Sequence, residues 1–175
     1  MAIILDGKTV SEKIINNLTT EVSGMEEKPH LVVIQVGDNP ASSIYVNIKK
    51  KKAEEVGIKS TVLHYSNSIS EKELIDKISE FNLDNSINAI LVQLPLPSHI
   101  DSDKVIKSIS PLKDVDGFTV ENSGSLLNAL EPLSYPCTPK GVLRLLDEYN
   151  IDVAGKHVVI VGRSNIVGKP LAIMM

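Results

Sequence analysis

A tyrosine and a lysine that could do chemistry stand together in the segment SIYVNIKKKK, residues 43–52. In a helix, where successive residues turn by about 100°, Lys49 follows Tyr45 by one turn on the same face. A partly buried lysine has a lowered pKa because burial disfavours its charged form, which suits it to general acid–base catalysis near neutral pH. The alternative is that the Lys49 stem covers a sheet edge, within a lysine run that is mainly a solvated surface.

The four lysines of this run are predicted to differ from one another. The inward face is centred on Tyr45 and is completed by Ala41, Ile48, Ala53 and Val56. Lys49 falls inside this arc, whereas Lys50 and Lys51 point outward. Lys52 is inward in angle, but it lies closer to the helix end, where a long stem reaches water.

Gln93 stands at the carboxyl end of an apolar segment, directly before the sequence LPLP. In open parallel sheets, ligands bind outside the carboxyl ends of the strands. A polar residue at this point can be aimed at a ligand, and the prolines can hold the turn rigid, with either a trans or a cis X-Pro bond. The alternative is a glutamine at the edge of the sheet that meets water.

Two aspartates occupy the segment KDVDGF, residues 113–118. The spacing of Asp114 and Asp116 before Gly117 resembles part of a calcium loop, but the further acidic ligands that an EF-hand requires are missing from the pattern. We therefore expect no metal site here. A carboxylate of this loop could instead accept hydrogen bonds from the N–H and amino groups of a planar ring, or it could close an Asx turn before the glycine.

A glycine turn follows the apolar run at 158–161. We predict a strand over this run, a turn at Gly162 and a helix that begins near Gly168, which is the setting that a phosphate-binding turn requires. Ser164 replaces the second glycine of the G-x-G-x-x-G pattern, and its hydroxyl could help to hold a pyrophosphate. Arg163 could face a 2′-phosphate, which favours NADP over NAD. The alternative is a turn whose glycines serve packing alone.

The composition excludes several classes of protein. The 175 residues carry a formal net charge of −4, which gives no electrostatic footprint for nucleic acid. No window approaches the length of a membrane span, and the apolar run at the N-terminus is too short for a signal peptide. Because Cys137 is the one cysteine of the sequence, no internal disulfide is expected, which favours a reducing cytoplasm.

The remaining pattern predicts strands that alternate with amphipathic helices. Strands are predicted at 31–36, 58–66 and 87–97, and helices at 8–25, 39–57, 68–82, 101–109 and 138–150. Ser70 and Glu73 form a capping-box pattern, and Thr138 as N-cap with Pro139 marks the start of the last helix. Such alternation indicates an α/β fold with a parallel sheet whose faces are covered. Residues 111–136 are less periodic, and we place the boundary region there.

Five segments in this order resemble a single family. They are YVNIKKKKAEEVGI, ILVQLPLP, KDVDGF, PCTPKGVLRLL and GKHVVIVGRSNIVGKP. Over essentially its whole length the chain resembles the methylenetetrahydrofolate dehydrogenase/methenyltetrahydrofolate cyclohydrolase family. The resemblance implies an N-terminal three-layer α/β folate-binding catalytic domain at 1–136. Residues 137–175 are then a linker helix and the first strand–turn–helix of a Rossmann-type NADP-binding domain.

The resemblance also implies an activity and the residues that carry it. The activity is NADP-dependent oxidation of 5,10-methylenetetrahydrofolate, followed by hydrolysis to 10-formyltetrahydrofolate, in one-carbon metabolism and purine biosynthesis. Lys49 resembles the general acid–base, Gln93 the glutamine that tunes it, and Tyr45 the ring that stacks on folate. Asp116 resembles the aspartate that anchors the pterin. The NADP turn is represented by Gly162, Arg163, Ser164, Ile166 and Gly168.

The chain departs from the family pattern in length and at one position. Members are longer and form homodimers largely through the nucleotide domain, so we expect that domain to be incomplete here and a homodimer for the full-length protein. Lys52 stands where a small residue is more usual, and its charge would lower the pKa of Lys49. The alternatives are a truncated, inactive module that binds folate or a partner, and an oxidoreductase of the shikimate dehydrogenase type. Tyr45 and Lys49, followed by Gln93, argue against the latter.

Overall fold

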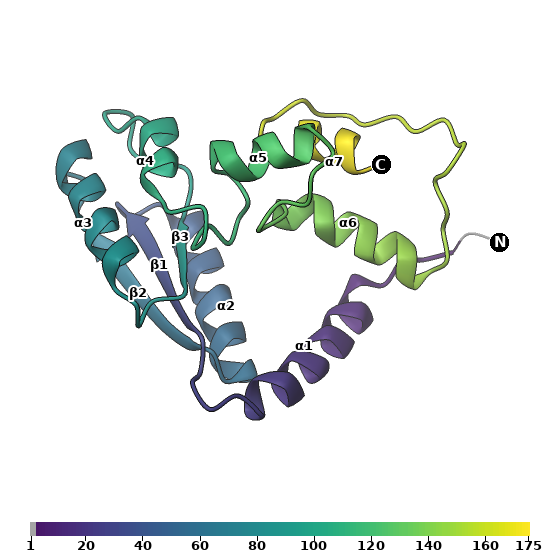
Figure 1. Ribbon diagram of the computed structural model, residues 1–175, viewed down its shortest axis with the longest axis horizontal. Coiled ribbons are helices and arrows are strands. Elements are labelled where there is room, and N and C mark those ends of the chain that lie inside the picture. Colours follow the sequence, from purple (N-terminus) through teal and green to yellow (C-terminus); the bar gives the residue numbers. More distant parts are fainter. Residues whose placement is uncertain (1–2) are drawn as a thin grey trace. The chain divides into compact units, whose positions relative to one another are not determined.

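The computed structural model describes residues 3–175 as three strands and seven helices (Figure 1). In chain order they are α1 (Gly7–Ser23), β1 (His30–Val36), α2 (Pro40–Val56), β2 (Lys59–Tyr65), α3 (Glu71–Leu83), β3 (Ala89–Val92), α4 (Ser102–Ser108), α5 (Val120–Leu127), α6 (Cys137–Glu148) and α7 (Gly168–Met174). The chain divides into two compact units. The sheet unit is Ile15–Asp114, and the helical unit joins the residues up to Ile14 to Val115–Met175.

The sheet unit is built on a parallel sheet in the order β2-β1-β3. The central strand β1 pairs with β2 along its whole length, from His30 to Val36, and with β3 from Leu31 to Ile34. Helices α3 and α4 lie on one face of the sheet, and α2 lies on the other (Figure 1). This arrangement confirms the predicted α/β fold with a covered parallel sheet.

Alternation along β1 separates the two packing surfaces of the sheet. Val32, Ile34 and Val36 face α3 and α4, where they join a buried cluster that also contains Leu74, Ile78, Ile87, Ile90, Val92, Ile100, Val105 and Ile109. Val33 and Gln35 alternate to the opposite face and are buried there against α2. The sheet therefore packs against α3 and α4 on one face and against α2 on the other.

The ends of α2 and α3 are set by their own sequence. The side chain of Asn39 accepts a hydrogen bond from the first turn of α2, and Gly57 ends this helix with φ at 87°. The predicted capping box of α3 is confirmed. The amide of Glu73 donates to Oγ of Ser70 at 3.2 Å, and the amide of Ser70 donates to Oε2 of Glu73 at 2.9 Å.

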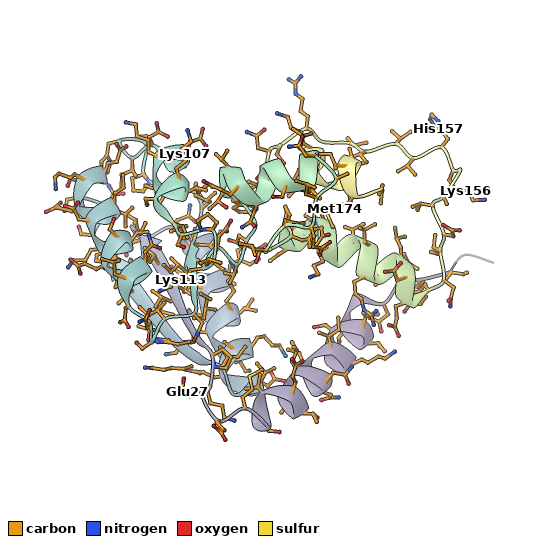
Figure 2. All side chains as sticks on the ribbon, viewed as in Figure 1. Glu27, Lys107, Lys113, Lys156, His157 and Met174 are labelled. Carbon is orange, nitrogen blue, oxygen red and sulfur yellow. The ribbon has the colours of Figure 1, made fainter. Side chains whose placement is uncertain are left out.

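Lys113 connects the end of the sheet unit to the last turn of α3 (Figure 2). Its ammonium donates to the main-chain oxygens of Phe81 and Asp84 at 2.9 and 2.7 Å. A cation is favoured at this end of a helix because the last carbonyls have no intrahelical partner. The amide of Ile90 donates to the Lys113 carbonyl at 2.8 Å, and Ile90 also forms a parallel bridge with Asp114. The start of the KDVDGF segment thus runs beside β3.

Two predictions about the helical unit are wrong at the level of helix boundaries. Helix α5 falls inside 111–136, where the sequence predicts no helix. The sequence does not reveal it because its Asn-Ser-Gly-Ser stretch has low helix propensity. Helix α6 begins at Cys137 rather than after Thr138. The carbonyl of Pro136 already accepts the first helical bond, from the amide of Lys140 at 3.0 Å, so the cap lies two residues earlier than predicted.

The strand predicted at 158–161 is also wrong. This run pairs with no other strand among residues 3–175, and Val159 and Val161 are 73% and 100% exposed. A strand is stable only when a neighbour satisfies its N–H and C=O groups. The described part of the helical unit supplies no such neighbour. Apolar composition alone therefore does not produce the strand, although the helix predicted after the glycine turn is present as α7.

Candidate functional site

The course of the chain brings Lys49 to the carboxyl end of the sheet. Helix α2 follows β1, so its first turns lie where the strands end. Side chains on a helix lean toward its N-terminus, so the Lys49 stem runs back toward that end. Gln93 is the first residue after β3, and its amide donates to the Ile34 carbonyl at 2.8 Å. The Lys49 ammonium donates to Oε1 of Gln93 at 3.1 Å.

The side-chain amide of Gln93 is held by the main chain of the next residue. Its Nε2 donates to the carbonyl of Leu94 at 2.7 Å, which leaves Oε1 directed at Lys49. The Leu94–Pro95 peptide bond, which the sequence left open between two isomers, is cis. Lys49 and Gln93 are both half-buried. The structure therefore presents one ammonium group on a fixed acceptor at the end of the sheet where ligands of parallel α/β folds bind.

The inward face of α2 differs from the predicted one. Tyr45 and Ile48 are 60% and 52% exposed, whereas the buried residues are Ser42, Val46, Ala53 and Val56. The helix is rotated so that Tyr45 leaves the buried arc and only Lys49 of the pair keeps partial burial. The physical reason is that Val46, Ala53 and Val56, together with the small Ser42, pack on the sheet, which turns the Tyr45 side of α2 away from it. An aromatic ring in this position is open to stacking.

The other lysines of the run are exposed, and two of them pair with glutamates of α2. Lys50 lies 3.8 Å from Glu54, and Lys52 donates to Glu55 at 2.8 Å. Lys52 thus reaches water near the helix end, as the sequence predicted. Among the described contacts of these four lysines, that of Lys49 with Gln93 is the one that reaches outside α2.

Asp116 lies in the helical unit, at a loop whose geometry depends on the next residue. Gly117 has φ at 67°, and a Cβ placed on it would lie 2.6 Å from the carbonyl oxygen of Ser134. Only glycine fits this left-handed and crowded position. The loop therefore fixes the backbone at Asp116, which is half-buried. The sheet unit contains Tyr45, Lys49 and Gln93, and within it Lys49 contacts Gln93. Asp116 belongs to the helical unit.

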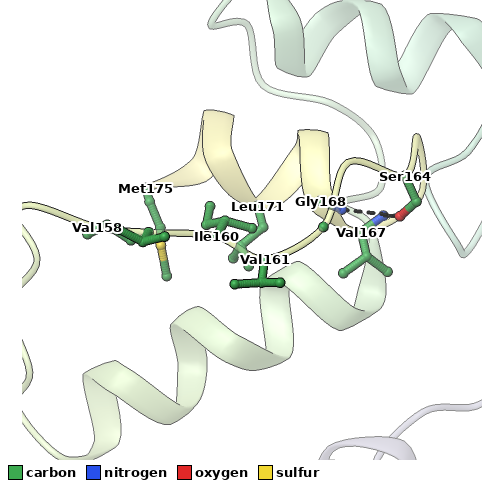
Figure 3. Close-up of a pocket in the computed structure, with 10 residues that line it drawn as sticks. Val158, Ile160, Val161, Ser164, Val167, Gly168, Leu171 and Met175 are labelled. Carbon is green, nitrogen blue, oxygen red and sulfur yellow. Dashed lines mark hydrogen bonds between the residues drawn. The ribbon is translucent and has the colours of Figure 1, made fainter.

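The glycine turn of the helical unit is closed by its serine (Figure 3). Oγ of Ser164 accepts hydrogen bonds from the amides of Val167 and Gly168 at 3.1 and 3.3 Å. Gly162 has φ at 155°, and a Cβ on Gly168 would lie 2.5 Å from the Gly162 carbonyl oxygen. Both glycines are therefore needed for the turn to close. Arg163 and Ser164 are exposed beside it, and Ile166 is half-buried.

A cavity of about 450 Å³ lies between this turn, the run before it and α7 (Figure 3). It is lined by residues 158–162, Ser164, Val167, Gly168, Leu171 and Met175. The walls are mainly aliphatic, and the glycine turn forms the polar end. Closely packed glycines, an exposed hydroxyl and an exposed guanidinium are the groups that hold the phosphates of a dinucleotide, so the residues present fit such a cofactor.

The sequence reasoning missed a buried amide under α2. Gln35 is only 5% exposed, and its Nε2 donates to the Gly37 carbonyl at 3.1 Å and to Oγ of Ser43 at 2.8 Å. One signal could have revealed it, since Gln35 interrupts an otherwise apolar strand in the sequence HLVVIQV. Most buried side-chain amides in native proteins are hydrogen-bonded. A buried glutamine of this kind therefore links the segments that its hydrogen bonds reach.

Two classes of site are not found in residues 3–175. No group of three or more His, Cys, Asp or Glu side chains in this range is arranged to hold a metal ion. No helix in this range is both long enough and apolar enough to cross a membrane.

Comparisons with known proteins agree with one another over nearly the whole chain. The sequence model of the tetrahydrofolate dehydrogenase/cyclohydrolase catalytic domain matches residues 5–116, and that of the NAD(P)-binding domain matches residues 136–175. The chain is 51% identical to Bifunctional protein FolD of Streptococcus agalactiae serotype Ia, covering 98% of this chain and 62% of that protein. It is also 51% identical to Bifunctional protein FolD of Aquifex aeolicus, covering 100% and 62%.

Solved structures give the same result. The bifunctional FolD enzyme from Campylobacter jejuni is 49% identical with a TM-score of 0.94, covering 98% of this chain and 62% of that one. FolD from Trypanosoma brucei, complexed with NADP cofactor and inhibitor, is 32% identical with a TM-score of 0.95, covering 99% and 60%. The chain thus spans about 62% of the length of the curated relatives it matches. With a match that takes in more than half of its residues, this chain belongs to the tetrahydrofolate dehydrogenase/cyclohydrolase family.

Proposed function

We propose that the protein represented by this chain oxidises 5,10-methylenetetrahydrofolate with NADP and hydrolyses the methenyl product to 10-formyltetrahydrofolate. The observation that carries this proposal is the hydrogen bond of 3.1 Å from the Lys49 ammonium to Gln93 at the carboxyl end of the sheet. Membership of the family supports both reactions, because its described relatives are named bifunctional. No finding favours the alternative of an inactive folate-binding or interaction module.

In the hydrolytic step, Lys49 carries a proton from the attacking water to N5, and Gln93 orients Lys49. Water attacks the methenyl carbon, which is electrophilic because it lies between two nitrogens that share a positive charge. As the C–O bond forms, one proton of the water passes to the nitrogen of Lys49. The bond from that carbon to N5 then breaks, Lys49 returns the proton to N5, and the second proton of the water leaves to solvent as the carbonyl of the formyl group forms. The oxygen acceptor of Gln93 holds the Lys49 nitrogen in one place throughout.

Substrate binding is proposed for Tyr45 and Asp116. The ring of Tyr45 is 60% exposed one turn before Lys49, and it would stack on the flat part of folate. The carboxylate of Asp116 would accept hydrogen bonds from the pterin N–H and amino groups. Each role uses a group whose backbone is fixed, Tyr45 by α2 and Asp116 by the Gly117 loop.

The cofactor is proposed to be NADP, held at the glycine turn. The residues that would hold it are Gly162, Arg163, Ser164, Ile166 and Gly168. When bound, this cofactor accepts the hydride that leaves the methylene carbon. Arg163 supplies an exposed cation for a 2′-phosphate, and the structure of the Trypanosoma brucei relative is described as an NADP complex. The aliphatic cavity beside the turn would exclude water from the bound cofactor.

We also propose the domain division and the setting that the resemblance implies. Residues 1–136 would form the folate-binding catalytic domain and 137–175 the start of the NADP-binding domain, which the matches to 5–116 and 136–175 support. The protein would be a homodimer in the cytoplasm and would serve purine biosynthesis. A net charge of −4 is in keeping with the absence of a nucleic-acid partner.

A spectrophotometric assay tests the proposed function. Methylenetetrahydrofolate with NADP reports the oxidation, and methenyltetrahydrofolate alone reports the hydrolysis. Both are measured on the 175-residue chain and on any longer product of its gene. Turnover in either form is the expected result. Absence of turnover in every form would overturn the proposal in favour of the inactive module.

A further inference from the structure

We propose that Gln35 is a positioning residue that seats α2 on the sheet and thereby holds Lys49 at Gln93. The inference rests on the proposed role of Lys49, and it adds a residue that does not touch the substrate. Gln35 comes from the centre of the sheet, because β1 lies between the other two strands. Its side chain faces α2 rather than the α3 and α4 side.

Gln35 is the middle of three polar side chains on neighbouring strands. It pairs in register with His64 of β2, and Gln93 follows one position beyond the last pair of β1 with β3. Neighbouring strands are about 4.8 Å apart, so these residues form a short polar row at the carboxyl end of the sheet. The row runs under the first turns of α2, where Lys49 contacts one end of it.

The hydrogen bonds of Gln35 all lead to the start of α2. Nε2 donates to Oγ of Ser43 at 2.8 Å, and that hydroxyl donates to the Asn39 carbonyl at 3.2 Å. Nε2 also donates to the Gly37 carbonyl at 3.1 Å, which accepts a second bond from Nε2 of His64 at 2.9 Å. One buried amide therefore fixes both the turn between β1 and α2 and the first turn of the helix.

Two side-chain bonds add to the packing of α2 on the sheet and fix its register there. Ser43 is bonded to Gln35, and Lys49, six residues later and about 9 Å along the helix axis, is bonded to Gln93. Because the two bonds end on neighbouring strands, turning or sliding of the helix would strain at least one of them. A shift of about 1 Å at a catalytic group can lower turnover about a hundredfold. The Lys49 contact, at 3.1 Å, has little room before it ceases to be a hydrogen bond.

The chemistry of the position favours this role over simple packing. The other residues of β1 on both faces are apolar apart from His30 at its first position, and an apolar residue would fill the place of Gln35 without burying an amide. A buried amide adds stability only when its hydrogen bonds are satisfied, and it then also fixes the geometry of its partners. The partners here are the segments that carry the proposed acid–base residue.

Four substitutions test the inference in the form of the protein that turns over. Gln35→Met and Ser43→Ala each remove the bond between the strand and the helix, whereas Ser43→Thr keeps a hydroxyl. Asn82→Ala is the matched control, since its amide also makes two bonds, to the Ser108 carbonyl at 2.6 Å and from the Ser110 amide at 2.9 Å, but on the α3 and α4 side. For each variant, kcat and KM for methenyltetrahydrofolate are measured together with the thermal midpoint.

The expected result separates positioning from stability. Gln35→Met and Ser43→Ala should lower kcat about 10- to 100-fold with KM changed less than about twofold, and Ser43→Thr should restore most of kcat. Asn82→Ala should lower the thermal midpoint but leave kcat unchanged. Equal kcat in Gln35→Met and the unsubstituted protein would overturn the inference. So would a loss of kcat in Asn82→Ala as large as in Gln35→Met.

A second measurement decides the inference even if the proposed function fails. The ¹³Cε signal of Lys49, assigned by its disappearance in Lys49→Gln, reports the surroundings of the amine without any substrate. It should move in Gln35→Met and Ser43→Ala and stay in place in Asn82→Ala. An unmoved signal in Gln35→Met would show that Gln35 does not position Lys49, whereas absence of turnover with a moved signal would refute the proposed function alone.

Discussion

The ammonium nitrogen of Lys49 lies 3.1 Å from Oε1 of Gln93, a residue 44 positions away in the sequence. The contact exists because α2 starts, and β3 ends, at the same end of a parallel sheet. It distinguishes Lys49 from Lys50 and Lys52, which pair with glutamates of their own helix. If the proposed hydrolysis is correct, it should therefore depend on this single lysine and not on the positive charge of the run.

Replacing Lys49 by glutamine should lower methenyltetrahydrofolate hydrolysis about 10²- to 10⁴-fold, because the amide cannot take or return a proton. The fold should be retained, since Lys49 is only half-buried and glutamine keeps a polar end beside Gln93. Hydrolysis is followed by the loss of methenyl absorbance, and the fold by circular dichroism.

The control for this substitution is Lys50→Gln, which changes the net charge equally. Lys50 is exposed and lies 3.8 Å from Glu54, a surface pair that contributes little to stability. Its turnover should equal that of the unsubstituted protein. Unchanged hydrolysis in Lys49→Gln, or an equal loss in both variants, would remove Lys49 from the mechanism.

Replacing Tyr45 by alanine should weaken folate binding without changing stability. The ring is 60% exposed, so little buried area is lost, while a stacking contact is worth about 0.5–1.5 kcal/mol. KM for the folate substrate should rise about 2- to 12-fold. Tyr45→Phe keeps the ring and should keep KM, so an equal rise in both variants would point to the hydroxyl instead of to stacking.

The sheet unit was largely predictable from its sequence because its signals are local or periodic. Strand β1 was predicted to within one residue, and the Ser70–Glu73 pattern formed the expected capping box. The approach of Lys49 to Gln93 was harder, since it depends on strand order. The residues themselves placed Gln93 at the end of a strand, and the family resemblance supplied its partner.

The errors arose where tertiary partners decide the outcome. The helical periodicity of residues 39–57 predicts an inward face centred on Tyr45, but packing on the sheet selects the arc of Val46 and Ala53. The run at 158–161 has the composition of a strand and lacks a neighbour among the described residues. The role of Gln35 does not follow from the sequence alone, because its amide shows its partner only when the fold places Ser43 beside it.

The capping box of α3 should make stability depend on pH. The hydroxyl and the amide of Ser70 donate to the Glu73 carboxylate and hold its pKa below the ordinary value of 4.5. A carboxyl whose pKa is lowered by folding stabilises the protein above that ordinary value, and this stabilisation is lost as the pH falls through the lowered pKa. Glu73→Gln should therefore be less stable than the unsubstituted protein at neutral pH, and the difference should vanish in acid.

Urea denaturation at pH 7 and at about pH 3 measures this difference. Ser70→Ala removes the group that contributes most to the lowered pKa, so Glu73→Gln made in that background should change the pH dependence much less. A stability gap between Glu73→Gln and its parent that stays constant across this range would contradict the assignment.

The glycine turn has no room for a side chain at Gly168. A Cβ on Gly168 would lie 2.5 Å from the Gly162 carbonyl oxygen, a contact that the backbone must move to relieve. Gly168→Ala should therefore cost about 1–3 kcal/mol of stability and distort the amides that Ser164 holds. NADP affinity, measured by calorimetry in a form that binds it, should fall at least about fivefold.

Gly141→Ala is the control, because its new Cβ meets nothing within 4 Å and it lies inside α6. That variant should gain up to about 1 kcal/mol from helix propensity and keep its affinity for NADP. Equal affinity in the two variants would mean that the turn does not hold the cofactor.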